Sequence, residues 1–293
     1  MKTAGRLGLG LGMIALLALA AGCGDDEKPT APTTKATGDL DDPEFRRVEN
    51  TLSGAVEYGE MLLNNTWYVI GQVGDSTPGV ADDGRPTRQP FTPSSEGDST
   101  LLVYHSASQY WYFFAQEIMA QMTDTLTITL RDSVQFLQAT GPVQWPDSAL
   151  LTGINMGGRL SLVLTNGDSA AAAHVLAVMG QLSSGGDVTI NGTQDFLVDS
   201  HHGADSCEVF ADVHATATDI EMNLASNQSG GCPYGGVLWY RGNFDIACTG
   251  DPAVDFADVF TITGTFQGNN TIAYVVENST TRWTFTETCG DSI

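Results

Sequence analysis

Apolar and polar side chains alternate along most of the chain after Trp67, which is the period of a β-strand with one buried face. The alternation is clearest at 238–248 and 254–266, where large apolar residues occupy most of the alternate positions. Polar turn sequences follow at 268–270 and 277–279, and Asn166-Gly167 is a strong hairpin signal. Similar patterns predict strands at 101–105, 109–115, 125–131, 159–165, 187–191 and 206–218.

The segment 170–180, AAAAHVLAVMG, is ambiguous between a strand and a helix. Alanine favours a helix, and Asp168 or Ser169 could cap one. The Asn-Gly turn that precedes the segment favours the second strand of a hairpin, so we expect a strand here.

One segment has a helical period instead. Asp42 is a good N-cap, Pro43 suits the first helical position, and apolar residues then recur at steps of three and four until Asn64 and Asn65. We therefore predict an amphipathic helix at 43–63 that packs on the strands. With about ten or more strands, the fold class is all-β, an antiparallel meander that forms a barrel or a sandwich.

The N-terminus carries an export signal. Lys2 and Arg6 precede an apolar run at 7–21, which is typical of a cleavable signal peptide and shorter than a membrane-spanning helix. The sequence LAAGC at 19–23 resembles the lipobox of bacterial lipoproteins. That resemblance implies cleavage after residue 22 and acylation of Cys23. An ordinary cleavable signal with an incidental cysteine is the alternative.

Behind Cys23, the segment 23–42 is rich in Pro, Thr and Asp and has no hydrophobic period, so we expect a flexible tether. The predicted organisation is a signal peptide at 1–22, a lipidated tether at 23–42 and a helix plus β-domain at 43–293. The resemblance implies an envelope protein whose partner is a membrane, bound through the lipid at Cys23, and whose domain is periplasmic or extracellular. The membrane is the outer one if the host has two.

Charge excludes some functions. The chain of 293 residues has 35 acidic and 12 basic residues, a formal net charge of −23, and no lysine after Lys35. Such a chain repels nucleic-acid phosphates. Because no lysine follows Lys35, the predicted β-domain cannot use a lysine to form a Schiff base. We expect no nucleic-acid partner and no cofactor.

Four cysteines remain besides Cys23, and an even number in an exported chain predicts disulfides. Three pairings are possible. Cys232 follows a glycine-rich loop after the strand that Cys207 begins, so a local bridge could close this excursion. We therefore predict the pairs Cys207–Cys232 and Cys248–Cys289.

Two clusters could bind a ligand. His201, His202 and Asp205 could bind zinc or copper, although a solvated polar loop is the simpler interpretation. Tyr110, Tyr112 and Phe114 share one face of a predicted strand and could form a wall for an apolar or sugar ligand, although core packing is the default.

Familiar catalytic motifs, such as a Gly-x-Ser-x-Gly elbow or a His-Glu-x-x-His helix, do not occur in the sequence. We therefore expect a non-catalytic domain that is structural or that binds a small apolar ligand or a glycan. The alternative is an exported hydrolase whose Asp, Glu and His residues come together from distant positions.

Overall fold

The computed structural model describes residues 35–75, 89–90, 99–120, 124–147, 149–182, 186–201, 207–223, 233–249, 253–268 and 270–288. The predicted signal peptide, Cys23 and the tether up to residue 34 lie outside this part of the chain. His202, Asp205, Cys232 and Cys289 also lie outside it.

The described residues contain one helix, α1 (Pro43–Asp75), of 33 residues. Its start agrees with the sequence, because Asp42 Oδ1 accepts a hydrogen bond of 2.9 Å from the backbone N–H of Glu44 and thus caps the helix. At 1.5 Å per residue, a helix of this length spans about 50 Å.

The predicted end of the helix at residue 63 is wrong, because α1 continues for three more turns through Asn64, Asn65 and Trp67. Aromatic and β-branched residues after position 66 favour a strand by intrinsic propensity. The apolar stripe that faces the sheet nevertheless continues through Leu62, Leu63 and Ile70, and burial of this stripe outweighs local propensity.

The strands form a single 14-stranded sheet with the order β1-β14-β13-β12-β11-β10-β9-β8-β7-β5-β4-β3-β2, and β6 pairs with β5. Apart from the parallel contact of β1, all strand pairs are antiparallel, and from β2 to β14 strands that are consecutive in the chain are neighbours except that β7 pairs with β5 and not with β6. The predicted meander is therefore confirmed. The strands are β1 (Ala36–Thr37), β2 (Gln89–Pro90), β3 (Ser99–His105), β4 (Tyr110–Ala120), β5 (Thr125–Gln138), β6 (Gly141–Val143), β7 (Leu151–Leu164), β8 (Ser169–Gly180), β9 (Asp187–Ser200), β10 (Cys207–Asn223), β11 (Gly235–Cys248), β12 (Val254–Phe266), β13 (Thr271–Glu277) and β14 (Thr281–Thr288).

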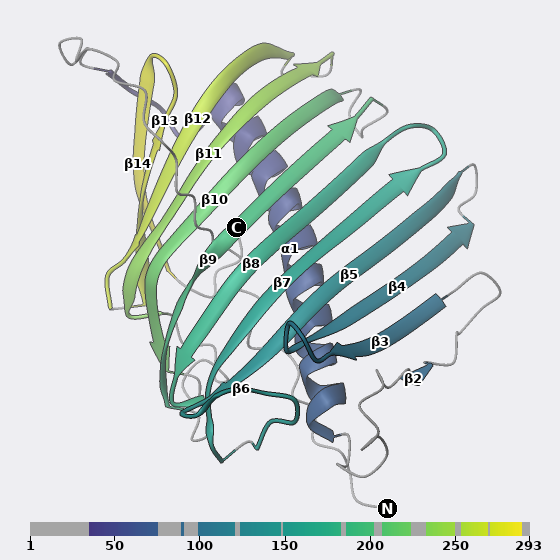
Figure 1. Ribbon diagram of the computed structural model, residues 1–293. Coiled ribbons are helices and arrows are strands. Elements are labelled where there is room, and N and C mark those ends of the chain that lie inside the picture. Colours follow the sequence, from purple (N-terminus) through teal and green to yellow (C-terminus); the bar gives the residue numbers. More distant parts are fainter. Residues whose placement is uncertain are drawn as a thin grey trace, which may run out of the picture.

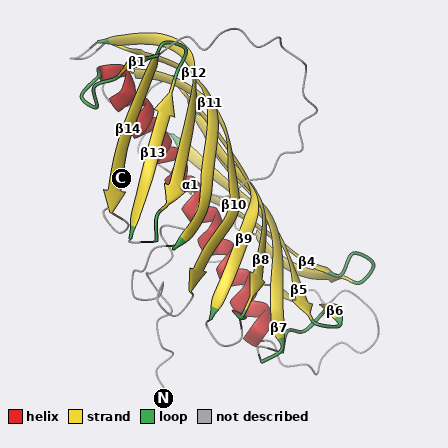
Figure 2. Cartoon of the chain, turned by 90° about the vertical axis from the view of Figure 1, so that its left-hand side faces the viewer, coloured by secondary structure: helices red, strands yellow, loops and turns green. Residues whose placement is uncertain are grey.

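The sheet is open and curved, and α1 crosses one of its faces obliquely (Figure 1). A view from the side shows the strands curving around the helix (Figure 2). We call the face that contacts α1 the inner face and the opposite one the outer face. Among the described strands, β1 and β2 end the sheet without pairing with each other, so the helix closes the inner face where a second sheet or a barrel wall would otherwise lie.

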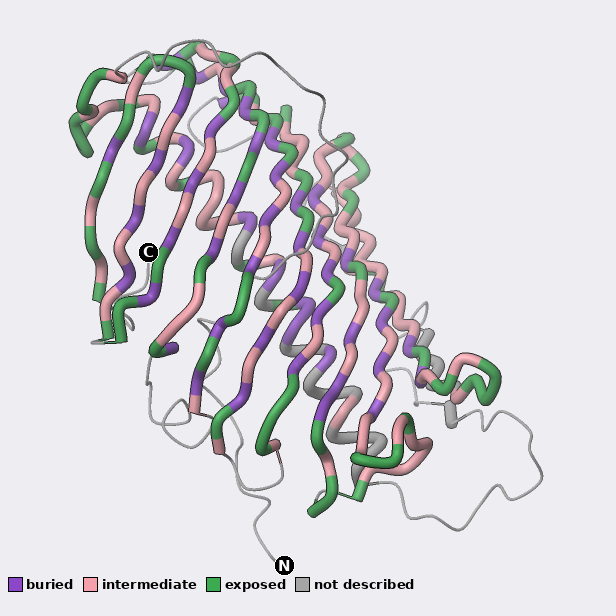
Figure 3. Tube along the Cα trace, turned by 60° about the vertical axis from the view of Figure 1, so that its left-hand side comes forward, coloured by how far each residue is buried: buried purple, intermediate pink, exposed green. Residues whose placement is uncertain are grey.

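Buried and exposed residues alternate along nearly every strand (Figure 3). The inner positions of successive strands form the core together with one stripe of α1. Typical members from the centre of this core are Leu62, Phe136, Leu160, Phe196 and Phe260. This one-sided burial is what the period of two in the sequence predicts.

The ambiguous segment at 170–180 is a strand, as the hairpin signal predicts. Gly167 has a φ of 105°, a conformation that a residue with a side chain rarely adopts. The backbone N–H of Leu164 donates to Asp168 O at 2.9 Å and closes the turn. The turn therefore outweighs the helix propensity of the alanines.

The end of the predicted tether packs on the sheet. β1 pairs with β14, and the indole Nε1 of Trp283 donates to Asp39 O at 2.9 Å. A Cβ on Gly38 would lie 2.0 Å from Trp283 Nε1, so this contact needs glycine. Residues 36–42 thus belong to the folded domain, which shortens the segment that could act as a spacer.

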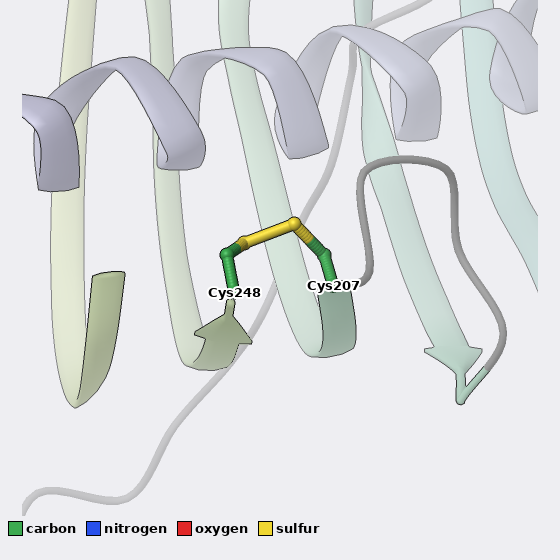
Figure 4. The surroundings of a disulfide bond; sticks show 2 residues. All are labelled: Cys207 and Cys248. Carbon is green, nitrogen blue, oxygen red and sulfur yellow. A yellow bond between two sulfur atoms is a disulfide. The ribbon is translucent and has the colours of Figure 1, made fainter. Parts of the chain in front are cut away.

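Cys207 and Cys248 form a disulfide bond (Figure 4). The predicted pairs Cys207–Cys232 and Cys248–Cys289 are therefore wrong. Cys207 begins β10, Cys248 ends β11, and the two are direct register partners with Cα atoms 4.0 Å apart. The strand register, which sequence spacing does not reveal, selects the pair and joins the ends of two neighbouring strands.

Candidate functional site

A pocket of about 690 Å³ lies between α1 and the inner face of β5, β7, β8 and β9. Such a volume falls within the range of pockets that hold small molecules. Among the described residues, its apolar lining comes from Tyr58 of the helix and from inner positions of the four strands, namely Leu126, Leu162, Leu164, Ala170 and Val198. The half-buried Tyr58 has a raised pKa, chiefly through burial and then through the charge of Glu57.

Polar groups of the pocket gather where the strands end. The polar lining residues in the described part of the chain are Asp124, Asp168, Ser169 and Ser200. Asp168 is held in place, because its Oδ1 accepts a hydrogen bond from the backbone N–H of His201 at 2.7 Å and its Oδ2 accepts one from Asn166 at 3.1 Å. An apolar floor with acidic groups at one end suits a ligand with an apolar body and a neutral or cationic head.

Further along the same strands, three polar side chains meet beneath the helix. Thr66 of α1 is fully buried, and Asp132 of β5 and His174 of β8 are 3% and 2% exposed. The Thr66 hydroxyl is hydrogen-bonded to Asp132 Oδ2, and its Oγ1 lies 3.5 Å from His174 Nε2. The three residues come from positions far apart in the sequence, so the fold alone brings them together.

Gly158 of β7 makes room for this cluster. It is the register partner of Asp132 on one side and of His174 on the other. A Cβ at this position would lie 3.1 Å from Asp132 Oδ1 and 3.2 Å from His174 Nε2. The absence of a side chain thus lets both polar groups approach across the middle strand.

Burial sets the protonation states of the pair. It raises the pKa of Asp132 to about 7, against the opposing hydrogen bonds from Thr66 and from the backbone N–H of Ser133. Burial also lowers the pKa of His174 to about 4. Both groups are therefore biased towards their neutral forms, as expected for buried groups without a full counter-charge.

The hydrogen bonds agree with a protonated Asp132. Thr66 Oγ1 also contacts Leu62 O at 3.1 Å, and one hydroxyl proton cannot be donated to both oxygens. In the neutral form of Asp132 the carboxylic acid can donate to Thr66 Oγ1 in place of accepting from it, which frees the hydroxyl proton for Leu62 O. His174 Nδ1 has no hydrogen-bond partner among the described residues. The cluster therefore attaches α1 to the sheet.

The three aromatic residues that we predicted as a ligand wall lie on the outer face of β4, away from the pocket. Tyr112 is 45% exposed, and Tyr110 and Phe114 are partly exposed. The neighbours Trp111 and Phe113 point inward and are buried in the core. The guanidinium of Arg131 lies over the Phe114 ring, with its Cζ 5.8 Å from the ring centroid.

The predicted metal ligands are described only in part. His201 follows β9, and its Nε2 lies 3.2 Å from Asp199 Oδ1. The other two residues of that prediction, at 202 and 205, are outside the described part. Where the structure describes the chain, no three His, Cys, Asp or Glu side chains converge in a geometry that would hold a metal ion.

Sequence reasoning missed the buried cluster, although a signal for it exists. Asp132 stands between the apolar inner positions Leu130 and Val134, and His174 stands between Ala172 and Leu176. A lone titratable residue at an inner position of an otherwise apolar strand face indicates a buried polar contact. It does not reveal the partner.

No known protein family matches this chain, and neither the curated proteins nor the solved structures include a similar one. In the described part of the chain, no helix combines the length and the apolar character that crossing a bilayer requires.

Proposed function

We propose that this protein is a lipid-anchored protein of the bacterial cell envelope, and that its β-domain binds a small apolar ligand between α1 and the sheet. The observation that carries the proposal is the pocket beneath Tyr58, with its apolar floor and its polar end. The anchor is the acylated Cys23, inferred from the lipobox-like sequence. No catalytic step is part of the proposal.

The arrangement of the helix supports this function. Tyr58 lies at the pocket, and Thr66 lies at the buried cluster eight residues later, about 12 Å further along the helix axis. The hydrogen bonds of Thr66 with the sheet hold the part of the helix that follows the pocket wall. A helix fixed at that point keeps the pocket preformed, which lowers the entropic cost of binding.

A direct test is native mass spectrometry of the protein released from membranes. We expect a mass above that of the acylated polypeptide, from a co-purified ligand that organic solvent extracts. The same measurement reports the anchor: the peptide that begins at Cys23 should carry acyl chains. An unmodified thiol on that peptide would contradict the anchor but not the pocket.

Binding itself can be measured with the neutral dye Nile red and the unacylated Cys23→Ser chain. Ala170→Leu adds a side chain at the pocket lining and should abolish saturable binding. Ala171→Leu is the matched control, because the neighbouring residue points to the outer face and should bind as the parent chain does. Ser200→Phe tests the polar end of the pocket if Ala170→Leu fails to fold. Saturable binding that both pocket variants retain would contradict the proposed site.

A further inference from the structure

The described strands contain four basic residues, and all four lie in one row across the outer face of the sheet. The register partners run from Arg131 to Arg159 and continue through Ala173, Asp195 and His214 to Arg241. From there the row passes Thr261 and Glu277 and ends at Arg282. In a chain with a net charge of −23, this concentration of cations is unexpected.

The members of the row differ in their neighbours. Arg282 lies 3.7 Å from Glu277, and His214 lies 2.5 Å from Asp195. Arg131 and Arg159 are both exposed and face each other directly, yet neither forms an ion pair with any described residue. Like charges at directly opposed positions destabilise a sheet, so this pair is costly without an anion beside it.

The row next to the arginine pair supplies further contacts. Tyr112, Ser133 and Gly157 are register partners there, and Gly157 leaves the surface beside Arg159 without a side chain. In the next outer row, two residues away along β5 and β7, Asn155 Nδ2 donates to Gln135 Oε1 at 3.0 Å. Asn155 Oδ1 has no partner among the described residues and can accept a hydrogen bond.

We infer that this patch, formed by Tyr112, Arg131, Ser133, Asn155, Gly157 and Arg159, binds an anionic glycan. The patch offers groups that can bind both the charged groups and the sugar rings of such a ligand. Guanidinium groups bind sulfate, phosphate or carboxylate through paired hydrogen bonds. The exposed tyrosine ring offers an apolar face to a sugar ring. The Ser133 hydroxyl donates to Gly157 O at 2.9 Å, so it and Asn155 Oδ1 can accept hydrogen bonds from sugar hydroxyls.

Charge complementarity selects this occupant. The nearest carboxylate in the arginine row is Asp195, two strands beyond Arg159, and it pairs with His214. Apolar side chains border the patch, since Phe114 lies under the Arg131 guanidinium and the exposed Val175 is the register partner of Gly157, and they offer further apolar faces to sugar rings. The inference is independent of the pocket, which lies on the inner face and has an acidic end.

The test uses the full-length protein in a neutral detergent and an oligosaccharide of dextran sulfate, titrated by calorimetry. We expect binding that weakens with salt, as binding that depends on charge does. Arg131→Gln and Arg159→Gln should each weaken it about tenfold, which corresponds to one charged hydrogen bond. Tyr112→Ala should weaken it less, and Arg159→Lys should restore part of the loss because it keeps the charge without the planar fork.

Arg241→Gln is the matched control, since it removes the same charge from the same row and should change the dissociation constant less than twofold. Thermal unfolding of each variant is measured alongside, and these exposed substitutions should leave the melting temperature unchanged. The inference is overturned if dextran sulfate does not bind, or if Arg241→Gln weakens binding as much as the other variants. It is also overturned if unsulfated dextran binds equally well, or if sodium sulfate competes at the same sulfate concentration. A failed dye titration at the pocket would leave this result unaffected.

Discussion

Asp132 and His174 approach each other across Gly158, the residue that both face from the neighbouring strands β5 and β8. Neither group has a full counter-charge, and Thr66 of α1 contacts both from the helix that covers the inner face. A helix and two strands, with β7 between them, are thus joined by polar contacts in the middle of an apolar core. Breaking this contact should affect how the helix is attached before it affects the sheet.

Gly158→Ala tests the space in the cluster. The added Cβ would lie 3.0 Å from Leu62 Cδ1 and 3.1 Å from Asp132 Oδ1, so helix and sheet must separate slightly. We expect a loss of about 1–3 kcal/mol in the free energy of unfolding, measured with urea. Gly157→Ala is the control, since its Cβ would meet Ser133 Oγ at 3.2 Å on the outer face. Equal effects of the two substitutions would show that the cluster does not depend on the missing side chain.

The free energy of unfolding should depend on pH in opposite ways in the variants Asp132→Asn and His174→Gln, because the two buried groups contribute to stability in different pH ranges. The raised pKa of Asp132 means that the folded state binds its proton more tightly than the unfolded state does. Its contribution is therefore largest below about pH 4 and disappears as the pH rises to about 7. The lowered pKa of His174 has the opposite effect, and its contribution is present above pH 6.5 and disappears as the pH falls to about 4.

In the wild type these two contributions largely cancel between pH 4 and 6.5. Asp132→Asn leaves His174, so stability relative to the wild type should rise with pH across this window. His174→Gln leaves Asp132, so stability relative to the wild type should fall as the pH rises across the same window. Each change should amount to up to about 3 kcal/mol. Urea titrations at several pH values measure both slopes. His105→Gln, at an exposed position, should follow the wild type, and parallel profiles for all variants would refute the assignment.

Two glycines of α1 offer a comparison of close packing with intrinsic propensity. A Cβ on Gly54 would meet nothing within 4 Å, whereas one on Gly59 would lie 2.3 Å from Gln194 Nε2 and 2.8 Å from Phe196 Cε1. Gly54→Ala should therefore raise stability by about 0.5–1 kcal/mol through helix propensity. Gly59→Ala should lower it, because the helix must move away from β9. Calorimetric melting temperatures that shift in the same direction would contradict the position of α1.

Loss of the disulfide should destabilise the fold without changing its topology. The bond between Cys207 and Cys248 closes a loop with a sequence separation of 41 residues. In the chain-entropy account, such a loop contributes about 4 kcal/mol. The double variant Cys207→Ser/Cys248→Ser should therefore melt at a lower temperature than the oxidised wild type. Peptide mapping without reduction should recover the two half-cystines together, and a different partner for Cys207 would contradict the strand register.

Local patterns were sufficient for most of the fold. Alternation along 238–248 and 254–266 predicts β11 and β12, and the Asn166-Gly167 turn predicts the hairpin of β7 and β8. Both features depend on residues that are close in sequence, because side-chain direction in a strand and φ in a turn are local properties. The start of α1 at Asp42 is local in the same way.

The failures involve distant contacts. The helix passes residue 63 because Thr66 and Ile70 still pack against the sheet, and Cys207 pairs with Cys248 because β10 and β11 are aligned at these ends. The aromatic residues of β4 could be sorted into two faces from the sequence, but which face meets the core depends on the helix.

The sequence by itself determined an antiparallel sheet, a capped helix and an acidic chain, since each can be read from residues that are close in the sequence. Only the tertiary structure decided that Thr66, Asp132 and His174 meet, that the pocket lies under Tyr58, and that four arginines form one row. The register between strands and the path of the helix set these contacts. Both result from the packing of the whole core, which no short segment encodes.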